Sequence, residues 1–405
     1  MSGPLTGIRV LDLSRILAAP LTAQLLGDLG AEVIKVERPG SGDDARQYGP
    51  PFHGAPSDQQ SGFYLSANRN KRSVTIDHSQ PDGAELVAEL AERSDVLIEN
   101  YRGGVLAKYG LDYATLRTRN TGLVYCSVTG FGQDGPLANR AGYDGVFQAM
   151  CGMMSVSGVP DGEPGAGPMK VGVSMVDVLT GLYAASAIVA ALHHRDTGSG
   201  AGQHIDLALL DCGVAALSHY VQNYFVSGVA APRRGNGGFG GIPSQAFRCA
   251  DAEIFVVAST AKQWSALSAA LGRPELGADP RFSTVSARIA NRDLVLDTLS
   301  GIFAEQDADY WVRRLDDADV PVSPVNTMAG VFENPQVRHR GMKRTISAAG
   351  GGSIDVLANP IRFSDTVIDT YTAPPLLGAN TREVLESVLG KTDEQIDALQ
   401  IRHTI

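Results

Sequence analysis

The first 37 residues carry a strand pattern, a helix pattern and a second strand pattern in direct succession. Residues 8–13, IRVLDL, are a short run of aliphatic and β-branched side chains. A helical pattern follows from Pro20 to Gly30, and residues 31–37, AEVIKVE, return to a strand pattern. This order predicts a β-α-β unit, and with it an α/β fold built on a parallel sheet.

The turn between the first strand and the helix argues against a dinucleotide site. Its sequence, SRILAAP, has no glycine, whereas the G-x-G-x-x-G fingerprint needs glycines there for the backbone to approach a pyrophosphate. Arg38 follows the second strand, where such sheets contact the adenosine ribose, and a basic residue suits a ribose phosphate. That phosphate could belong to coenzyme A or to NADP, and an exposed arginine without a ligand fits the pattern equally well.

Later strand ends add further basic residues. The segment NRNKRSVTID places Arg69, Lys71 and Arg72 directly before a third strand pattern. A fourth strand pattern ends at Asn100, and LVYCSVTGFG is a fifth that enters a glycine loop. Arg102 and Lys108 come after the fourth. Ligands of open α/β sheets bind outside the carboxyl ends of the strands, so Arg38, Arg102 and Lys108 are expected on one side of the sheet. In an acidic chain this clustering favours a phosphate-bearing ligand.

The overall charge and the cysteines exclude several classes. A formal net charge of −10 and a pI of 5.3 argue against a nucleic-acid or anionic-membrane partner. The four cysteines are widely spaced without a C-x-x-C pair, which predicts neither a zinc site nor a redox motif and fits a reducing cytosol. No secretory pattern opens the chain, and its most apolar helix, of about 15 residues by the pattern, is shorter than the roughly 20 that a bilayer requires. We expect a cytoplasmic protein with no membrane partner.

The segment 171–192, VGVSMVDVLTGLYAASAIVAAL, predicts a helix with Asp177 near its start. Ser174 and Asp177 form an S-x-x-D pattern, so the simplest interpretation is a carboxylate that caps the helix. A carboxylate at this end of a helix also faces free N–H groups and the positive pole of the helix dipole, and should stay ionised at neutral pH. It could therefore act as a nucleophile toward a carbonyl carbon. The two interpretations are compatible.

From about residue 228 the composition changes. A glycine-rich loop spans 235–241 and opens a smaller α/β region with a hairpin and several helices, and short strands and two helices end the chain. A chain of 405 residues exceeds one hydrophobic core, so two domains are expected.

Several stretches, in this order, resemble the class III CoA-transferases of the CaiB/BaiF type, the family of formyl-CoA transferase and carnitine CoA-transferase. They are PLTGIRVLDLSRILAAPLTAQLLGDLGAEVIKVERPGSGDDAR, NRNKRSVTID, DVLIENYRGGVLAKYGL, AGYDGVFQAMCGMMSVSG, the segment around Asp177, GQHIDLALLD and PPLLGANTREVL. The resemblance covers the chain from its first residues to its last turn.

The resemblance implies an α/β fold with a Rossmann-like large domain built from both ends of the chain, a smaller central α/β domain, and two interlocked protomers. On that basis we expect 1–225 and 331–405 to form the large domain and 226–330 the small domain with the glycine loop.

The resemblance also implies a set of site residues. The family's nucleophilic aspartate falls on Asp177, and no metal or tightly bound cofactor is implied, with coenzyme A and acyl-CoA as substrates. The implied CoA contacts are Leu17, Ala18, Arg38, Ile76, Asn100, Arg102 and Lys108. The implied substrate and loop residues are Tyr143, Asp144, Gly237, Gly238, Gly240 and Gly241.

The implied activity moves CoA from an acyl-CoA to a carboxylic acid through an aspartyl-acyl anhydride and an aspartyl-CoA thioester. Formyl-CoA transferases carry a glutamine in place of Leu17 and a glycine in place of Ala19, which argues against oxalate or formate as acceptor. Racemases of this fold use a histidine in the position of Tyr143, and a phenol with a pKa near 10 is a poor substitute. An acyl-CoA racemase, a non-catalytic CoA-binding protein and, least of all, an NADP oxidoreductase remain alternatives.

Overall fold

The computed structural model describes residues 3–56, 58–238 and 240–405, and these form two compact units. The large unit contains the described residues up to Met153, together with Lys170–Val229 and Arg340–Ile405. The small unit contains Met154–Met169 and Ala230–His339. The boundaries that we drew from the sequence, at 226 and 331, lie near two of these breaks, and they did not separate the segment 154–169.

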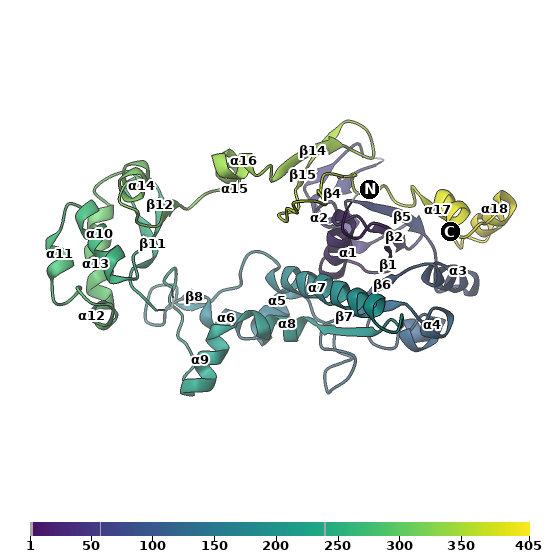
Figure 1. Cartoon of the computed structure of the whole chain (residues 1–405), viewed down its shortest axis with the longest axis horizontal. Coiled ribbons are helices and arrows are strands. Elements are labelled where there is room, and N and C mark those ends of the chain that lie inside the picture. Colours follow the sequence, from purple (N-terminus) through teal and green to yellow (C-terminus); the bar gives the residue numbers. More distant parts are fainter. Residues whose placement is uncertain (1–2, 57, 239) are drawn as a thin grey trace. The chain divides into compact units, whose positions relative to one another are not determined.

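A parallel sheet forms the centre of the large unit (Figure 1). In the described residues its strands are β1 (Arg9–Asp12), β2 (Glu32–Glu37), β5 (Lys71–Thr75), β6 (Val96–Glu99), β7 (Val124–Thr129) and β10 (His204–Ala208), in the order β10-β7-β6-β1-β2-β5. Counted along the chain, the spatial order is 3-2-1-4-5-6, that of a Rossmann sheet. The order reverses between β1 and β6, and ligands of such sheets bind at that reversal.

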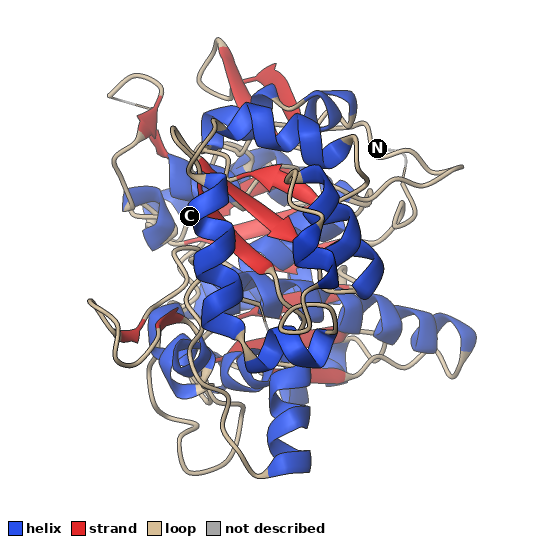
Figure 2. Ribbon diagram, turned by 90° about the vertical axis from the view of Figure 1, so that its left-hand side faces the viewer, coloured by secondary structure: helices blue, strands red, loops and turns tan. Residues whose placement is uncertain are grey.

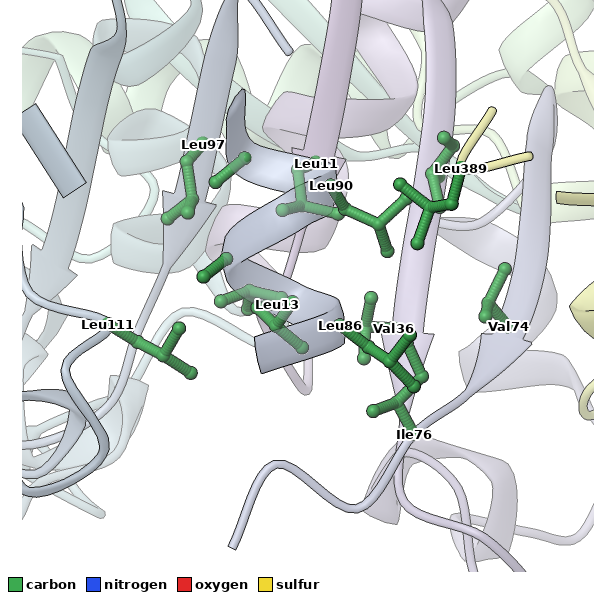
Figure 3. Packing of buried hydrophobic residues seen from close by; sticks show 14 of the residues in the cluster. Leu11, Leu13, Val36, Val74, Ile76, Leu86, Leu90, Leu97, Leu111 and Leu389 are labelled. Atoms are coloured by element: carbon green, nitrogen blue, oxygen red, sulfur yellow. The ribbon is translucent and has the colours of Figure 1, made fainter. Parts of the chain in front are cut away.

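Helices cover both faces of this sheet, and each face has its own buried core. Figure 2 colours the helices of the chain blue and its strands red. On one face lie α1 (Ala18–Asp28) and α7 (Met175–Thr197), which pack on side chains such as Val10 and Ile98. On the other lie α3 (Pro81–Glu92), α17 (Thr381–Ser387) and α18 (Asp393–Ile401). Figure 3 shows Leu11 and Leu13 packed with Leu86 and Leu90 on that second face. The alternation of strand side chains between these two cores is what fixes the register of the sheet.

Helix α7 is longer than its sequence pattern indicated. It has 23 residues, against the 15 or so that we expected, because the helix continues past the apolar run to Thr197. By length and composition alone it could cross a membrane, with a mean hydropathy of 1.8 over its most apolar window, of which 39% is buried. Helices that pack a protein core pass the same test, and the inner side of α7 packs on α1 and on the sheet.

The end of the chain completes the large unit. Asn70, before β5, exchanges hydrogen bonds with Thr372: its N–H donates to the Thr372 carbonyl over 3.1 Å, and the Thr372 N–H donates to its Oδ1 over 2.7 Å. The N–H of Asp77 donates to the carbonyl of Thr404 over 2.8 Å. The C-terminal segment therefore closes the free edge of the sheet at β5.

The small unit has its own core. Strands β11 (Ser244–Arg248), β12 (Glu253–Val257) and β13 (Val322–Pro324) form an antiparallel sheet. The helices that cover it in the described residues are α10 (Ala261–Ala270), α11 (Glu275–Ala278), α12 (Val285–Ala290), α13 (Arg292–Phe303) and α14 (Ala308–Asp316). Trp264, Phe247 and Phe303 are among its buried side chains.

The segment 141–155 contains the whole of one short helix and the start of another. These are α5 (Asp144–Met150) and α6 (Met153–Val156), separated at Gly152, whose φ of +92° a helix does not permit. The remaining elements are η1 (Asp44–Gln47), β3 (Phe52–His53), β4 (Gln60–Ser61), α2 (Gly62–Ser66), η2 (Leu106–Tyr109), α4 (Tyr113–Arg119), β8 (Gly158–Val159), β9 (Gly167–Pro168), α8 (Leu209–Ala216), α9 (His219–Ser227), α15 (Met328–Glu333), α16 (Pro335–His339), β14 (Lys343–Ser347) and β15 (Ser353–Leu357).

Candidate active site

A cleft of about 480 Å³ opens in the large unit at the carboxyl ends of β1 and β6. The turn after β1, the segment after β6, the loop after β7, the start of α5 and the first turn of α7 all contribute to it. Its lining includes Arg15, Ile16, Leu17, Ala18, Asp44, Asn100, Tyr101, Arg102, Thr129, Arg140, Tyr143, Asp144 and Asp177. The cleft therefore lies at the reversal of strand order, where the fold predicts a ligand.

The turn after β1 adopts a glycine-like conformation without a glycine. Ile16 has a φ of +74°, in the left-handed region that costs a β-branched residue free energy. Its N–H donates to Oδ1 of Asp43 over 3.1 Å, and the other carboxylate oxygen of Asp43 lies 3.0 Å from Nζ of Lys35. Lys35 is fully buried and also donates to the carbonyl of Ser14 over 2.7 Å. A buried ion pair thus holds the turn in place.

Asn100 fixes the same turn from the β6 side. Its Oδ1 accepts the N–H of Arg15 over 2.9 Å, and its Nδ2 donates to the carbonyl of Arg15 over 2.7 Å. The amide that we expected to contact CoA therefore uses both of its atoms on the protein backbone. The side chain of Asn100 therefore positions the turn after β1.

The cap of α7 comes from Asp144 rather than from Ser174 or Asp177. Ser174 makes no capping hydrogen bond with its side chain. Oδ1 of Asp144 instead accepts the backbone N–H of Val176 over 2.8 Å and that of Asp177 over 3.3 Å. The capping interpretation of the S-x-x-D pattern is wrong, because a carboxylate from α5 satisfies these donors first.

Asp144 is itself held rigidly. It is 7% exposed, and its Oδ2 accepts a hydrogen bond from Nε2 of Gln148 over 2.6 Å. Oε1 of Gln148 accepts the N–H of Val171 over 2.9 Å, and Nε2 also donates to the carbonyl of Val173 over 3.1 Å. One network therefore ties the start of α5 to the segment that leads into α7.

Asp177 is half-buried in the cleft with an unengaged carboxylate. Within the described residues no donor is hydrogen-bonded to its carboxylate oxygens. Burial, and then the nearby carboxylate of Asp144, raise its pKa to about 7. Our expectation that the helix end keeps it fully ionised at neutral pH is wrong, because desolvation and a like charge outweigh the dipole.

A close contact between α1 and α7 fixes the position of Asp177 relative to the sheet. Gly181, one turn along α7, lies so near α1 that an added Cβ would be 2.8 Å from the carbonyl oxygen of Ala18. Thr22 of α1 donates to the carbonyl of Gly181 over 3.2 Å. The start of α7 is thereby fixed against the start of α1, which also lines the cleft.

A second cavity, of about 230 Å³, adjoins the cleft. Arg38, Ile76 and His78 line it, and it shares Arg15, Asp44, Tyr101 and Val105 with the cleft. The ring of His78 meets the rings of Tyr101 and Tyr109 edge to face, each at 5.5 Å. The two cavities form one continuous lining of the carboxyl ends of β1, β2, β5 and β6.

Three cations on this lining have no acidic partner in the described part of the chain. Arg15 pairs with Asp44 at 2.9 Å, but Arg38, Arg102 and Arg140 make no ion pair there. Guanidinium groups without a carboxylate partner are suited to phosphate oxygens.

The structure brings most of the expected site residues together. Leu17, Ala18, Asn100, Arg102, Tyr143, Asp144 and Asp177 line the cleft, and Arg38 and Ile76 line the adjoining cavity. Lys108 is exposed on η2 and lines neither, so its contact with CoA stays a prediction.

Sequence reasoning missed Arg15 and Arg140. Arg15 stands directly after β1, and Arg140 lies in the loop that follows β7, so the rule that we applied to the other strand ends covers both. No sequence pattern indicated that the ring of His78 would contact the rings of Tyr101 and Tyr109.

The expected glycines belong to the small unit. The N–H of Gly237 donates to the carbonyl of Arg234 over 2.8 Å, and that of Gly238 to the carbonyl of Ser244 over 2.7 Å. Gly240 has a φ of +99°, which favours glycine. The fully buried Arg288 donates to the carbonyl of Ile242 over 2.6 Å and so anchors the exit of the loop. Among the described residues no cluster of three or more His, Cys, Asp or Glu side chains is arranged to hold a metal ion.

Comparison with known proteins identifies the family. A sequence profile described as CoA-transferase family III matches residues 5–381. The chain belongs to CoA-transferase family III. It is 40% identical to the succinyl-CoA:glutarate CoA-transferase of Homo sapiens over 98% of this chain and 88% of that protein. It is 41% identical to a succinate–glutarate CoA-transferase of Agrobacterium fabrum over 94% of this chain and 95% of that one.

A solved structure supports the same family and fold. The crystal structure of a CaiB/BaiF family protein from Brucella suis matches with a TM-score of 0.86 and 41% identity, covering 96% of this chain and all of that one. The α/β fold with a parallel central sheet and the enzyme class, a CoA-transferase that uses CoA thioesters, are thereby confirmed. The racemase, the non-catalytic binding protein and the NADP oxidoreductase gain no support from these relatives.

Proposed function

We propose that this CoA-transferase moves CoA from an acyl-CoA to a carboxylic acid by covalent catalysis at Asp177. The names of its relatives make succinyl-CoA and glutarate the first donor and acceptor to consider. The observation that carries the proposal is the carboxylate of Asp177. It lines the cleft at the reversal of strand order, and no donor among the described residues is hydrogen-bonded to it.

The reaction runs in four balanced steps. An oxygen of Asp177 attacks the thioester carbon, the C–S bond breaks, and a mixed anhydride and CoA thiolate form. The thiolate attacks the aspartyl carbonyl carbon of the anhydride, which gives an aspartyl-CoA thioester and releases the donor acid as its carboxylate. The acceptor carboxylate then attacks the aspartyl thioester carbon, the C–S bond breaks, and a second mixed anhydride and CoA thiolate form. The thiolate attacks the acceptor's carbonyl carbon in this anhydride, which gives the new acyl-CoA and expels the carboxylate of Asp177. Asp177 ends as a carboxylate, and no net proton is consumed.

The environment of Asp177 suits a nucleophile. A carboxylate whose pKa is raised to about 7 is more basic than an ordinary one, and therefore more nucleophilic once ionised. Because Asp144 already accepts the N–H groups of Val176 and Asp177, the carboxylate of Asp177 is not tied up as a cap. Its oxygens remain available to the thioester.

The same lining supports CoA binding. Leu17 makes no side-chain cap at the start of α1, and Leu17 and Ala18 both line the cleft, so uncapped N–H groups at this helix start are available to phosphate oxygens. Arg102 and Arg140 add positive charge in the cleft, and Arg38 adds it in the adjoining cavity. This supports an arrangement in which the pyrophosphate binds near α1 and the ribose phosphate near Arg38.

Two interlocked protomers are part of the proposal. On the outer side of α7, Leu182, Tyr183 and Val189 are 48%, 45% and 41% exposed. A row of apolar side chains on one helix is typical of a surface that a partner covers, and a second copy of the chain would supply that cover.

The test is a transfer assay with purified protein. Incubation with succinyl-CoA and glutarate should yield glutaryl-CoA and succinate in equal amounts, and Asp177→Asn should lose the activity by a factor of 10³ or more. Asp211→Asn, a substitution of an exposed aspartate on α8, is the matched control and should keep it. Normal transfer by Asp177→Asn would refute the nucleophile, and failure of the wild-type enzyme with every donor and acid tried would refute the transfer itself.

A further inference from the structure

The turn after β1 has a backbone conformation that its own residues do not favour. Ile16 has a φ of +74°, and the left-handed region costs a β-branched residue free energy that a glycine at the same place would not lose. Ile16 lines the cleft beside Leu17 and Ala18. A group from elsewhere in the chain therefore has to hold this turn for the cleft to keep its form.

The carboxylate of Asp43 is that group. Its Oδ1 accepts the N–H of Ile16 over 3.1 Å and the N–H of Ala45 over 2.9 Å. Asp43 is 1% exposed, and its Oδ2 lies 3.0 Å from Nζ of Lys35. Burial opposes the charge on Lys35, but the carboxylates of Asp12 and Asp43 outweigh it and hold the pKa of the amine above its usual value. The amine therefore stays charged and keeps the carboxylate of Asp43 in place.

The end of β2 brings Asp43 within reach of the turn. The N–H of Asp43 donates to Oε2 of Glu37 over 3.0 Å, and Arg46 donates to both oxygens of Glu37 over 2.8 and 2.7 Å. A backbone N–H just before Asp43 donates to the carbonyl of Arg38 over 2.9 Å. Asp43 thus joins a loop that carries Arg38 in the adjoining cavity to the turn that carries Ile16 in the cleft.

The neighbouring Asp44 depends on the same side chain. Asp43 is the N-cap of η1, which begins at Asp44. Asp44 pairs with Arg15 at 2.9 Å, and both side chains line the cleft and the adjoining cavity. Loss of the Asp43 carboxylate would therefore release both sides of the junction between the two cavities.

We propose that Asp43 is a positioning residue for acyl-CoA, whose carboxylate imposes on the turn after β1 a conformation that a glycine would adopt unaided. This inference rests on the proposed binding of CoA along the cleft and the adjoining cavity. In dinucleotide-binding sheets, glycines let the first turn approach the ligand. Here an ion pair with Lys35 behind the turn supports an isoleucine in the left-handed region instead.

The test measures the dissociation constant of CoA by titration calorimetry, which does not depend on transfer. Asp43→Ala should bind CoA at least about 10-fold more weakly than the wild type, because the turn loses the acceptor that holds Ile16. At saturating succinyl-CoA, kcat should stay within about 3-fold of the wild-type value, because Asp144 fixes the start of α7 separately. A general loss of structure would lower kcat as well.

A second arm of the test uses the backbone preference at position 16. In the Ile16→Gly background the left-handed conformation costs little, so adding Asp43→Ala should weaken CoA binding by at most about 3-fold. A role in stability alone would give the same loss in both backgrounds. If Asp43→Ala does not fold, Asp43→Asn carries the same comparison. Its amide keeps an oxygen for the N–H of Ile16 and loses the charge that pairs with Lys35, so we expect a loss of about 3- to 10-fold.

Asp112→Ala is the matched control, because Asp112 also caps a short helix of the large unit, α4, and lines neither the cleft nor the adjoining cavity. It should bind CoA as the wild type does. An unchanged dissociation constant in the folded Asp43 variant, or an equal loss with and without Ile16→Gly, would overturn the inference. A wild-type enzyme that binds CoA with this dependence on Asp43 but transfers it to no acid would refute the proposed function alone, and one that binds no CoA would refute both.

Discussion

Oδ1 of Asp144 accepts the backbone N–H of Asp177, so the two acids at the start of α7 have different tasks. Asp144 is buried and fixes the helix, whereas Asp177 lies in the cleft with its carboxylate unengaged by described residues. The charge of the first also raises the pKa of the second. The following predictions depend on this division.

The acid limb of the pH–rate profile should report Asp177. Only the ionised carboxylate attacks, so kcat/KM should rise with pH through about 7 and then level off. At pH 6 the rate should be about one tenth of the plateau. In Asp144→Asn an amide oxygen still accepts the N–H groups but the like charge is gone, so the limb should move to lower pH.

Glu99 needs a control in that experiment, because burial raises its pKa to about 7 as well. Its side chain points to the opposite face of the sheet, on the side of Leu97 in the same strand. Glu99→Gln should therefore leave the acid limb in place. If the limb stays fixed in Asp144→Asn and moves in Glu99→Gln, the titrating group is not Asp177.

Replacing Asp177 should stabilise the enzyme above neutral pH. Its pKa is raised from 3.8 in the unfolded chain to about 7 in the native state, so the native state holds the extra proton between these values and stability falls as pH rises through that window. Asp177→Asn removes this cost. After allowance for partial solvent exposure, urea unfolding at pH 8 should show a gain of ~1–2 kcal/mol, shrinking as the pH is lowered toward 4. The control Asp211→Asn should show no such trend, and a gain independent of pH in Asp177→Asn would contradict the assigned pKa.

Gly181→Ala should separate α7 from α1. The new Cβ would lie 2.8 Å from the carbonyl oxygen of Ala18, so we expect a loss of ~1–3 kcal/mol in unfolding free energy and a disproportionate loss of kcat as Asp177 moves. Gly301→Ala, also within a helix but facing open space, should be neutral or stabilising by ~0.5–1 kcal/mol. Equal behaviour of the two variants would show that the contact does not position the site.

Asn100→Asp should weaken acyl-CoA binding more than it slows the chemistry. The carboxylate cannot donate to the carbonyl of Arg15, and it adds negative charge beside the cleft. A lost hydrogen bond of about 1–3 kcal/mol corresponds to a KM for acyl-CoA that is higher by roughly 5- to 150-fold. Steady-state kinetics with Asn223→Asp, on α9 away from the cleft, supply the control. An unchanged KM in Asn100→Asp would remove the turn after β1 from the CoA site.

Local sequence patterns predicted the parts of the fold that depend on neighbouring residues. The strands and helix of residues 8–37 and the strand end at Asn100 occur as expected, since periodicity and strand-end chemistry are local signals. Asp177 could be singled out for the same reason, because its position near a helix start is visible in the pattern.

The remaining features depend on contacts between residues far apart in sequence. Asp144 caps α7 from 33 residues before Asp177, and Asp43 supports Ile16 from 27 residues beyond it. Arg292 reaches the loop at Gly237 from another helix. No local pattern marks such partners, and for that reason the sequence pattern assigned the cap of α7 to the wrong residues.

Chemical trapping of the acylated side chain tests the account most directly. The enzyme is treated with hydroxylamine in the presence or absence of succinyl-CoA, and its peptides are examined by mass spectrometry. The account predicts loss of activity and a hydroxamate on Asp177 only when succinyl-CoA is present, and neither in Asp177→Asn. Continued transfer with no adduct on Asp177, or an adduct on a different residue, would contradict it.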